Sequence, residues 1–310
     1  MKRREFLKGS AAASLTLAAA PALKAQQGSP LITKAIPSTG EQIPVVGLGT
    51  NEFGDRGGYT NASAEDRQPI LEVLKAYTDH GNALIDTAPA YSGSEKVLGE
   101  LLSQLGAKDK VTLATKTFPR HTGMEQHEQT LLESHALLDM PTLDMVGIHN
   151  GTNWQELLPF LREAKQEGKV RYIGLTFSKT NQHAEMAEVM RNEPMDFVQV
   201  NYNMLDRNAE NEVLSVALDK GLAVLGNIPY ATGDVFSRVS GVDLPDFAKE
   251  FDCQSWGNFF LKYNVSHPAM TACVPGTTKA HHALDNLQAA MGRLPNASER
   301  KMQEDFIASL

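Results

Sequence analysis

The strongest constraint on the fold of this chain is an alternation of strand-like and helix-like segments that repeats eight times. Short apolar runs predict strands at 45–49, 83–86, 111–115, 143–148, 171–175, 196–200, 222–226 and 271–274. Amphipathic runs predict helices at about 65–80, 94–104, 125–139, 154–167, 180–192, 209–220, 246–263 and 280–290. This repeat predicts a (β/α)8 barrel, and a doubly wound sheet is the alternative. Eight pairs without a topological break favour closure into a barrel.

The helix predictions depend on periodicity and on end signals. Apolar residues between positions 70 and 77 recur every three or four residues, which places them on one face of a helix. The sixth helical segment stops at Gly221, a residue typical of helix ends. A small hairpin is expected before the barrel, with 31–34 paired with 42–45. A capped helix is expected over 298–310, so residues 26–310 are predicted to form one barrel domain.

The first 25 residues have the pattern of a targeting signal. The basic segment at 2–8 carries paired arginines, Arg3 and Arg4, and an Ala-rich apolar stretch at 11–22 follows it. This stretch is too short to span a bilayer stably, but it suits a signal peptide, and the paired arginines resemble a twin-arginine signal. A disordered basic tail is the alternative. Cleavage is expected after Ala22 or Ala25, with the second favoured.

The signal predicts where the protein works and what it meets on the way. We expect recognition by the twin-arginine translocation machinery, a periplasmic location and no stable membrane anchor after cleavage. The twin-arginine route resembles a pathway for proteins that are already folded, often around a cofactor. An exported enzyme has no access to the cytoplasmic nicotinamide pool, so it must keep its cofactor tightly or meet another supply.

Composition excludes several classes of function. The 310 residues are 42% hydrophobic and 21% charged, as in ordinary soluble globular proteins. A formal charge of −8 offers no basic surface for nucleic acid. The two cysteines, Cys253 and Cys273, have no metal-ligand spacing, and we expect two free thiols, with a single bridge between them as the alternative.

Four chemically active side chains follow three consecutive predicted strands. Asp86 ends the second strand and Tyr91 lies in the loop after it, while Lys116 and His149 end the third and fourth strands. Barrel enzymes carry their chemistry at the carboxyl ends of the strands, so these groups are expected to converge. A buried Asp–Lys pair that only joins two strands is the alternative for Asp86 and Lys116.

The four residue types together suggest acid–base chemistry at a carbonyl group. A tyrosine hydroxyl has a pKa of about 10, and a neighbouring ammonium is expected to lower that pKa by favouring the phenolate. Asp86 would keep Lys116 charged and in place, and His149 would donate a hydrogen bond to a substrate oxygen. None of these groups donates hydride, so a redox reaction requires a nicotinamide.

Several motifs in register resemble the aldo/keto reductase family over essentially the whole chain from residue 31. They are Gly47–Thr50, Asp86–Tyr91 followed by Gly93-Ser94-Glu95, Thr115-Lys116, Leu143-Asp144 with His149, Val170–Thr176, Val198–Asn203, and Val274–Lys279 followed by Asp285-Asn286-Leu287. The resemblance implies that Tyr91 is the general acid/base, Lys116 its partner, Asp86 the support of Lys116, and His149 the residue that orients the carbonyl.

The resemblance also implies a nicotinamide site and a substrate pocket. Its cofactor-binding positions correspond to Gly49, Thr50, Asp86, Thr176, Gln199, Asn227, Pro229, Gly276, Thr277, Thr278, Lys279, His282 and Asn286. The substrate pocket is expected to include Asn51, Phe118 and Asn150, and no residue is assigned to a metal. Lys279 with Thr277 and Thr278 favours NADP(H), with NAD(H) as the alternative.

The chain departs from the family pattern mainly around the cofactor. Asn227 stands where many members have an aromatic residue on the nicotinamide, and Phe177 replaces an asparagine of the strand-five motif. Asn51 and Asn150 replace tryptophans, which hints at a polar substrate pocket. His282 stands where many members have an arginine on the 2′-phosphate.

The function that this pattern predicts is hydride transfer between a nicotinamide and an aldehyde or ketone, or the corresponding alcohol. Two alternatives remain: an exported cofactor-binding barrel that acts as an accessory or redox-sensing protein, and a metal-dependent barrel hydrolase. The hydrolase lacks ligand spacing. Five further histidines are expected at the surface, namely His121, His127, His135, His183 and His281.

Overall fold

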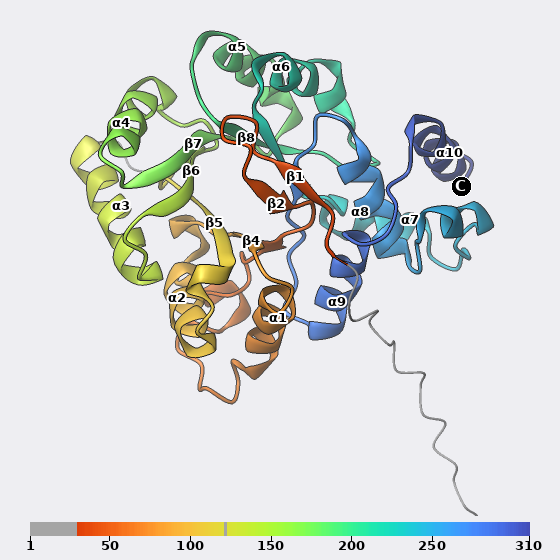
Figure 1. The fold of residues 1–310 in the computed structure, drawn as a ribbon, viewed down its shortest axis with the longest axis horizontal. Coiled ribbons are helices and arrows are strands. Elements are labelled where there is room, and N and C mark those ends of the chain that lie inside the picture. Colours follow the sequence, from red (N-terminus) through yellow and green to blue (C-terminus); the bar gives the residue numbers. More distant parts are fainter. Residues whose placement is uncertain (1–29, 121–122) are drawn as a thin grey trace, which may run out of the picture.

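The fold is a closed parallel barrel surrounded by helices (Figure 1). We describe residues 30–120 and 123–310 of a computed structural model, and the expected signal peptide at 1–25 lies outside them. Within these residues, eight parallel strands lie in the order β10-β9-β8-β7-β6-β5-β4-β3. Parallel bridges from Val46 to Cys273 and from Gly49 to Gly276 join the first strand to the last. The predicted (β/α)8 fold is confirmed.

The elements follow the predicted alternation closely. The barrel strands are β3 (Leu48–Gly49), β4 (Ala83–Asp86), β5 (Val111–Lys116), β6 (Leu143–His149), β7 (Val170–Thr176), β8 (Phe197–Asn201), β9 (Ala223–Asn227) and β10 (Ala272–Cys273). The helices are α1 (Gln68–Thr78), α2 (Ser94–Leu105), α3 (Met124–Leu138), α4 (Trp154–Gln166), α5 (His183–Asn192), α6 (Val213–Lys220), α7 (Asp234–Arg238), α8 (Trp256–Ser266), α9 (Ala280–Ala289) and α10 (Ala297–Ala308).

The interior of the barrel is filled by side chains from alternate strand positions. Leu84, Met145, Tyr172 and Phe197 belong to one buried apolar cluster that draws on strands around the whole barrel. Side chains on a strand alternate between its two faces, so residues two or four positions further along each strand point inward as well. The barrel is therefore a packed core whose inward rows continue to the carboxyl ends of the strands.

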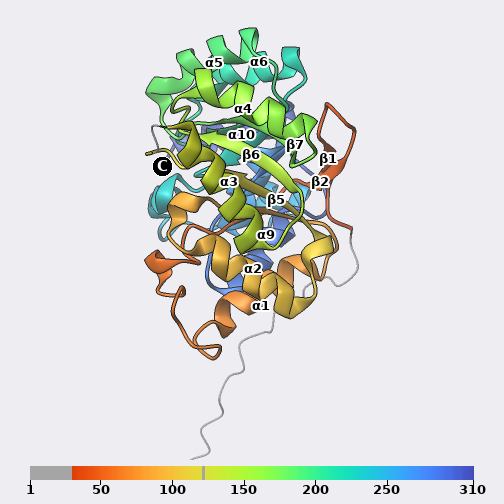
Figure 2. The same ribbon diagram turned by 90° about the vertical axis from the view of Figure 1, so that its left-hand side faces the viewer.

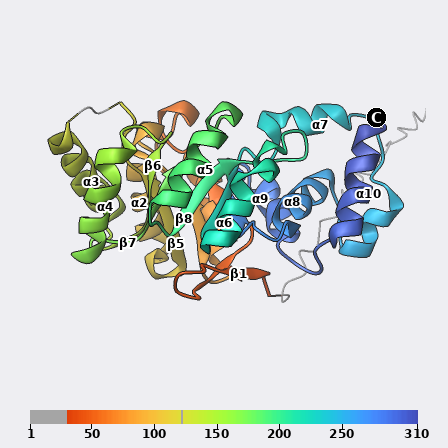
Figure 3. The same cartoon turned by 90° about the horizontal axis from the view of Figure 1, so that it is seen from above.

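The predicted hairpin closes the other end of the barrel. Strands β1 (Thr33–Ala35) and β2 (Gln42–Pro44) pair in antiparallel fashion, with Lys34 opposite Ile43. Ile43 and Ile36 are fully buried in the interior cluster, so the hairpin seals the barrel against water at its amino-terminal face. Figure 3 shows β1 at one end of the barrel and α7 at the opposite end.

One predicted helix was wrong in its continuity. The segment expected as a single helix over 246–263 is a 3-10 helix at Asp246–Phe251 followed by α8. Asp252 adopts φ 58° between them, and the Ser255 side chain caps α8 by accepting a hydrogen bond from the Asn258 N–H. The left-handed residue ends one helix and the cap starts the next. Neither feature disturbs the apolar periodicity, and this is why the periodicity suggested a single helix.

The chain ends with the expected capped helix beside the barrel. Asn296 and Glu299 form a capping box at the start of α10. Arg300 of α10 donates to the carbonyl of Tyr263 and to the hydroxyl of Ser266, which fixes α10 against α8 (Figure 3). Figure 2 shows the hairpin of β1 and β2 at the edge of the molecule. In the part of the chain that is described, no helix has both the length and the apolar character needed to cross a bilayer.

Candidate active site

The inward rows of the barrel change from apolar to polar at the carboxyl ends of the strands. Asp86 lies two residues beyond Leu84, His149 four beyond Met145, and Gln199 two beyond Phe197. Parallel register places neighbouring members side by side: Thr176 of β7 pairs with His149 of β6 on one side and with Gln199 of β8 on the other. The strand period therefore gathers the polar side chains in one layer above the apolar core.

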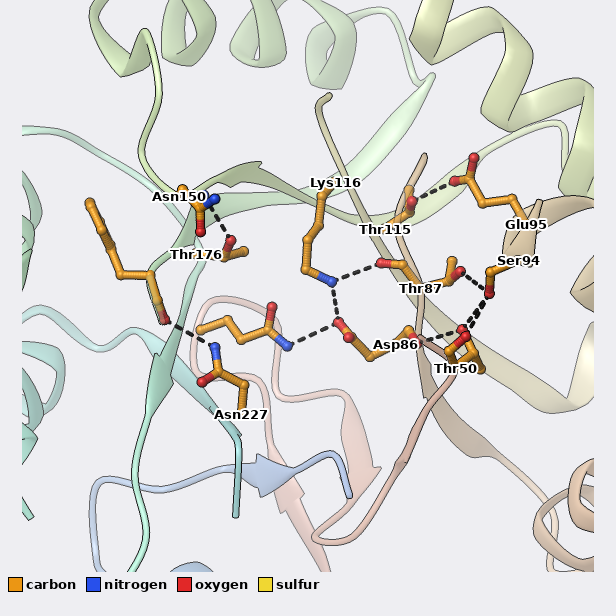
Figure 4. A network of polar contacts seen from close by, with 12 residues as sticks. Thr50, Asp86, Thr87, Ser94, Glu95, Thr115, Lys116, Asn150, Thr176 and Asn227 are labelled. Carbon is orange, nitrogen blue, oxygen red and sulfur yellow. Dashed lines mark hydrogen bonds and ion pairs between the residues drawn. The ribbon is translucent and has the colours of Figure 1, made fainter. Parts of the chain in front are cut away.

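Lys116 is the buried centre of this layer (Figure 4). Its Nζ donates to Asp86 Oδ1 at 2.7 Å and to the carbonyl oxygen of Thr87 at 2.7 Å. Gln199 Nε2 donates to the same Asp86 oxygen at 2.9 Å. A buried ion pair is tolerated when such additional hydrogen bonds satisfy both charges. Strands β4, β5 and β8 thereby hold one ammonium in one position.

Tyr91 reaches this layer from the loop after β4. It ends a 3-10 helix at Pro89–Tyr91, and the next residue, Ser92, has φ 38°. Lys116 Nζ lies 5.2 Å from the centre of the Tyr91 ring. The rings of Tyr91 and His149 meet edge to face with centroids 6.2 Å apart. The structure thus brings together all four residues that the sequence places at the ends of three strands.

The protonation of Tyr91 differs from the sequence-based expectation. Burial raises the pKa of Tyr91, and the nearby charge of Lys116 lowers it without cancelling the effect of burial. The sequence suggested a phenol more acidic than usual, which was wrong for the net shift because it counted the ammonium and not the loss of solvent. Tyr91 is therefore a neutral phenol at physiological pH, the form that can donate a proton.

Of the two basic side chains beside Tyr91, Lys116 is charged and His149 is neutral. Burial by itself lowers the pKa of Lys116, but Asp86 and Tyr91 outweigh it and the net shift is upward, so the ammonium stays charged. Burial, aided by the charge of Lys116, lowers the pKa of His149 to about 4. The imidazole is neutral at pH 7. Its Nδ1 is buried without a hydrogen-bond partner among the described residues, so the tautomer with its proton on Nε2 costs less.

A second set of buried hydrogen bonds fixes the backbone around Asp86 and the start of α2. Thr50 Oγ1 donates to the Asp86 carbonyl at 2.9 Å, and Ser94 Oγ lies 2.8 Å from the Thr50 carbonyl and 3.1 Å from Thr87 Oγ1 (Figure 4). Glu95 accepts from Thr115 Oγ1 at 2.6 Å, and burial raises the pKa of its carboxyl group. The Ser-Glu start of α2 therefore ties the helix to β3 and β5.

A cavity of about 830 Å³ opens beside these residues at the carboxyl ends of the strands. Asp86 and Tyr91 line one part of it, and the segment after β10 and the start of α9 line another. Of the predicted cofactor residues, those on its wall are Gly49, Thr50, Asp86, Asn227, Pro229, Gly276, Thr277, His282 and Asn286. Thr176, Gln199, Thr278 and Lys279 lie outside its lining. So do Lys116 and His149.

Sequence reasoning missed much of the wall. Tyr230, Phe236 and Trp256 provide an aromatic face, and Asp285 adds a carboxylate held by Ser255 Oγ at 2.9 Å. The lining also contains Glu52, Arg56, Ile228, Thr232, Gly233, Ser255, Gly257, Val274 and Pro275. Most of these residues lie after β9 or at the start of α8. No chemical motif marks these residues, although those after β9 follow the carboxyl end of a barrel strand, where functional residues are expected. Val274, Pro275 and Asp285 do lie in motifs that resemble the family, but they are not among the predicted cofactor-binding residues.

The positions that depart from the family pattern have defined places. Asn227 Nδ2 donates to the Phe177 carbonyl at 3.0 Å, so these two substituted positions contact each other. Asn51 lines the cavity with its Oδ1 near Gly276, where an added Cβ would lie 3.3 Å away. Asn150, with φ 56°, and Phe118 are not part of the cavity wall, and their assignment to the substrate pocket stays a prediction.

The cavity suits a dinucleotide in its volume and in the chemistry of its wall. Its volume is at the large end of the usual range for small-molecule sites. The wall combines aromatic side chains with close-packed backbone: a Cβ on Gly49 would lie 3.0 Å from the Val274 carbonyl oxygen. Thr277 and His282 form one end, and Asp86 and Tyr91 belong to the layer around Lys116. Hydrogen-bonding groups thus occur along the whole wall.

The other titratable residues are mostly structural. His127 and His183 are buried, which corrects the expectation that they lie at the surface; His183 Nε2 lies 2.9 Å from Asn201 Oδ1. His121 falls outside the described residues. Cys253 and Cys273 are free and buried, as expected. Over residues 30–120 and 123–310, no group of three or more His, Cys, Asp or Glu side chains is placed to hold a metal ion.

Comparison with known proteins decides the family. The sequence profile of the aldo/keto reductase family matches residues 45–304. The chain belongs to this family. Relatives of this aldo/keto reductase include YhdN of Bacillus subtilis, 29% identical over 62% of the chain and 60% of YhdN. Another is the NADH-specific methylglyoxal reductase of Escherichia coli, 30% identical over 66% of the chain and 69% of that enzyme. The match to YhdN thus spans less than two thirds of its length.

Solved structures agree with the fold of this aldo/keto reductase. An aldo/keto reductase from Klebsiella pneumoniae, in complex with NADP and acetate, superposes with a TM-score of 0.71. The two chains are 22% identical, and the match covers 89% of this chain and 96% of the other. At this identity the likeness establishes the barrel architecture alone.

Proposed function

We propose that this aldo/keto reductase transfers hydride between a nicotinamide dinucleotide and an aldehyde or ketone, with Tyr91 as the general acid/base. One observation carries the proposal: a neutral tyrosine lies against a buried Lys116–Asp86 pair and a neutral His149 beside a cavity that suits a dinucleotide. Family membership and the relatives that act on carbonyl compounds, such as the methylglyoxal reductase, support it.

The four residues divide the work on the carbonyl oxygen. A bound nicotinamide dinucleotide would supply the hydride. Tyr91 donates its hydroxyl proton to the oxygen as negative charge develops there, and Lys116 stabilises the phenolate that remains. His149 donates an N–H hydrogen bond to the same oxygen. Asp86 keeps Lys116 charged and in position. In the oxidising direction Tyr91 takes the proton back.

The residues at the far end of the cavity favour NADP(H). His282 lies on the wall and His281 packs against it, with ring centroids 4.2 Å apart. Lys279 comes three residues earlier and is exposed. Burial, together with the charges of His281 and Lys279, lowers the pKa of His282. A 2′-phosphate would meet a basic group there, whose charge increases as pH falls. Asp285 on the same wall would repel the phosphate, and this repulsion is the observation that keeps NAD(H) as the alternative.

The proposed activity predicts both binding and turnover by the purified protein. Addition of NADPH should quench protein fluorescence with a lower Kd than NADH. Because the pKa of His282 is lowered, this histidine takes up a proton only below the usual range of histidine, so the NADPH Kd should change little from pH 8 to pH 7 and decrease as the pH falls below about 6.5. When the complex is mixed with methylglyoxal, the bound NADPH should be oxidised in a single turnover, and the absorbance near 340 nm should decrease. Tight binding of either dinucleotide without consumption of absorbance would contradict the catalytic proposal.

Binding without turnover would instead favour the second candidate, an accessory or redox-sensing barrel. The observation behind it is Asn227, which places an amide rather than an aromatic ring at the cavity wall and bonds to the Phe177 backbone. The intact group of Asp86, Tyr91, Lys116 and His149 makes catalysis the first candidate.

We also propose that the chain is exported by the twin-arginine route to the periplasm, and the support is the sequence of residues 1–25. Replacing Arg3 and Arg4 with lysines should keep the protein in the cytoplasmic fraction at precursor length, because the route reads the arginine pair. The unaltered chain should be recovered from the periplasm in a shortened form. Equal export of the two forms would refute the proposal.

A further inference from the structure

The wall segment after β9 holds an unfavourable backbone conformation. Ile228 has φ 51°, and Ala231 and Thr232 also have positive φ values of 48° and 56°. Ile228 is β-branched and precedes Pro229, two properties that disfavour the left-handed region. Ile228 nevertheless lines the cavity, as does Asn227 before it. Such a conformation persists only where neighbouring groups enforce it.

Two buried asparagines hold this segment from outside the cavity. Asn203 Nδ2 donates to the Ile228 carbonyl at 3.1 Å, and Asn264 Nδ2 donates to the Pro229 carbonyl at 3.1 Å. The side chains come from the loop after β8 and from α8, and neither residue lines the cavity. Asn203 is itself fixed, since its Oδ1 accepts from the backbone N–H groups of Leu205 and Asp206 at 3.0 and 2.8 Å.

The fixed segment positions other parts of the wall. Tyr230 follows Pro229, and its hydroxyl donates to Asn286 Oδ1 of α9 at 2.6 Å. Asn227 precedes Ile228 and bonds to the Phe177 carbonyl at 3.0 Å. A change of φ at Ile228 would turn the chain between these two anchors. The backbone of one residue therefore links the part of the wall at β9 to the part at α9.

We propose that Asn203 and Asn264 are positioning residues that hold the wall at Ile228-Pro229 in the shape that receives the dinucleotide. The proposal rests on the proposed function for the identity of the ligand. A wall that already has its binding conformation loses no conformational entropy when the ligand binds. The hydrogen bonds of Asn203 and Asn264, here called the clamp, therefore contribute to cofactor affinity rather than to the chemical step.

The sharpest test removes one donor and leaves the rest of Asn203 in place. In Asn203→Asp the carboxylate still accepts from Leu205 and Asp206, but it has no N–H for the Ile228 carbonyl and sets an oxygen against it. The matched control is Asn192→Asp, because Asn192 is exposed and donates to the Glu188 carbonyl on α5. Asn264→Leu removes the second donor independently and serves if Asn203→Asp does not fold.

The expected result is weaker binding of NADPH with unchanged chemistry. The Kd from fluorescence titration should increase about tenfold in Asn203→Asp and remain near the wild-type value in the control. The rate at saturating NADPH should change little, so the loss should fall on KM and not on kcat.

The outcomes separate this proposal from the function on which it rests. Wild-type protein that binds neither NADPH nor NADH would overturn both. Wild-type binding that Asn203→Asp, or Asn264→Leu in its place, leaves unchanged would overturn the clamp alone. So would an equal loss in the control. Equal decreases in kcat and in bound fraction would indicate partial unfolding and would also reject the positioning role.

Discussion

Tyr91→Phe should lower the rate of carbonyl reduction by about a thousandfold while NADPH binding stays within a factor of about three. The substitution removes only the hydroxyl, so the ring keeps its edge contact with His149 and its place below Lys116. Without the phenol no group at this position can give a proton to the substrate oxygen. His149 cannot replace it, because its pKa of about 4 keeps the imidazole neutral at pH 7, and the N–H of a neutral imidazole can donate a hydrogen bond but is too weak an acid to give up its proton.

Single-turnover absorbance near 340 nm and fluorescence titration measure the two effects separately. Tyr59→Phe is a suitable control, because Tyr59 packs against the core outside the cavity wall. The wild-type rate should be level from pH 6 to pH 8 and decline only in alkaline solution. The reason is that burial raises the pKa of Tyr91, so the proton donor is lost only at high pH. A reduction rate near that of the wild type in Tyr91→Phe would remove Tyr91 from the mechanism.

Lys116→Met should abolish turnover and also lower the free energy of unfolding by about 3–5 kcal/mol. The ammonium side chain is 3% exposed and Asp86 is 6% exposed, so the substitution leaves a buried carboxylate without its cation. The Thr87 carbonyl loses its donor as well. Activity is lost for a separate reason, because the phenolate formed on Tyr91 no longer has a positive charge beside it.

Urea denaturation of Lys116→Met and of the double variant Lys116→Met/Asp86→Asn distinguishes these effects. The double variant should regain part of the lost stability, since the stranded charge is gone, and should remain inactive. Lys169→Met is the control for stability: Lys169 pairs with Glu167 at the surface, where solvent screens such pairs and they contribute little to stability. Equal destabilisation of Lys116→Met and Lys169→Met would mean that the buried pair does not support the fold.

The sequence alone determined the barrel and the four central residues, because both depend on local patterns. A strand alternates its side chains with a period of two, so a polar residue at the end of an apolar run can be placed at the carboxyl end of a strand without coordinates. Asp86, Lys116 and His149 are such residues, and the structure places them in one layer with Tyr91. The break at Asp252 escaped prediction because the apolar periodicity continues across it.

Only the tertiary structure decided properties that depend on what surrounds a group. The net pKa shift of Tyr91 follows from its burial, which outweighs the ammonium that the sequence could name. The aromatic part of the wall, at Tyr230 and Trp256, lies more than a hundred residues from Asp86 in the chain, and no motif announces it. Asn203 ends one of the motifs that resemble the family, but the motif does not reveal its contact, since its hydrogen bond to Ile228 joins two different loops. Burial and contacts between distant segments are set when the barrel closes, and no local pattern in the sequence encodes them.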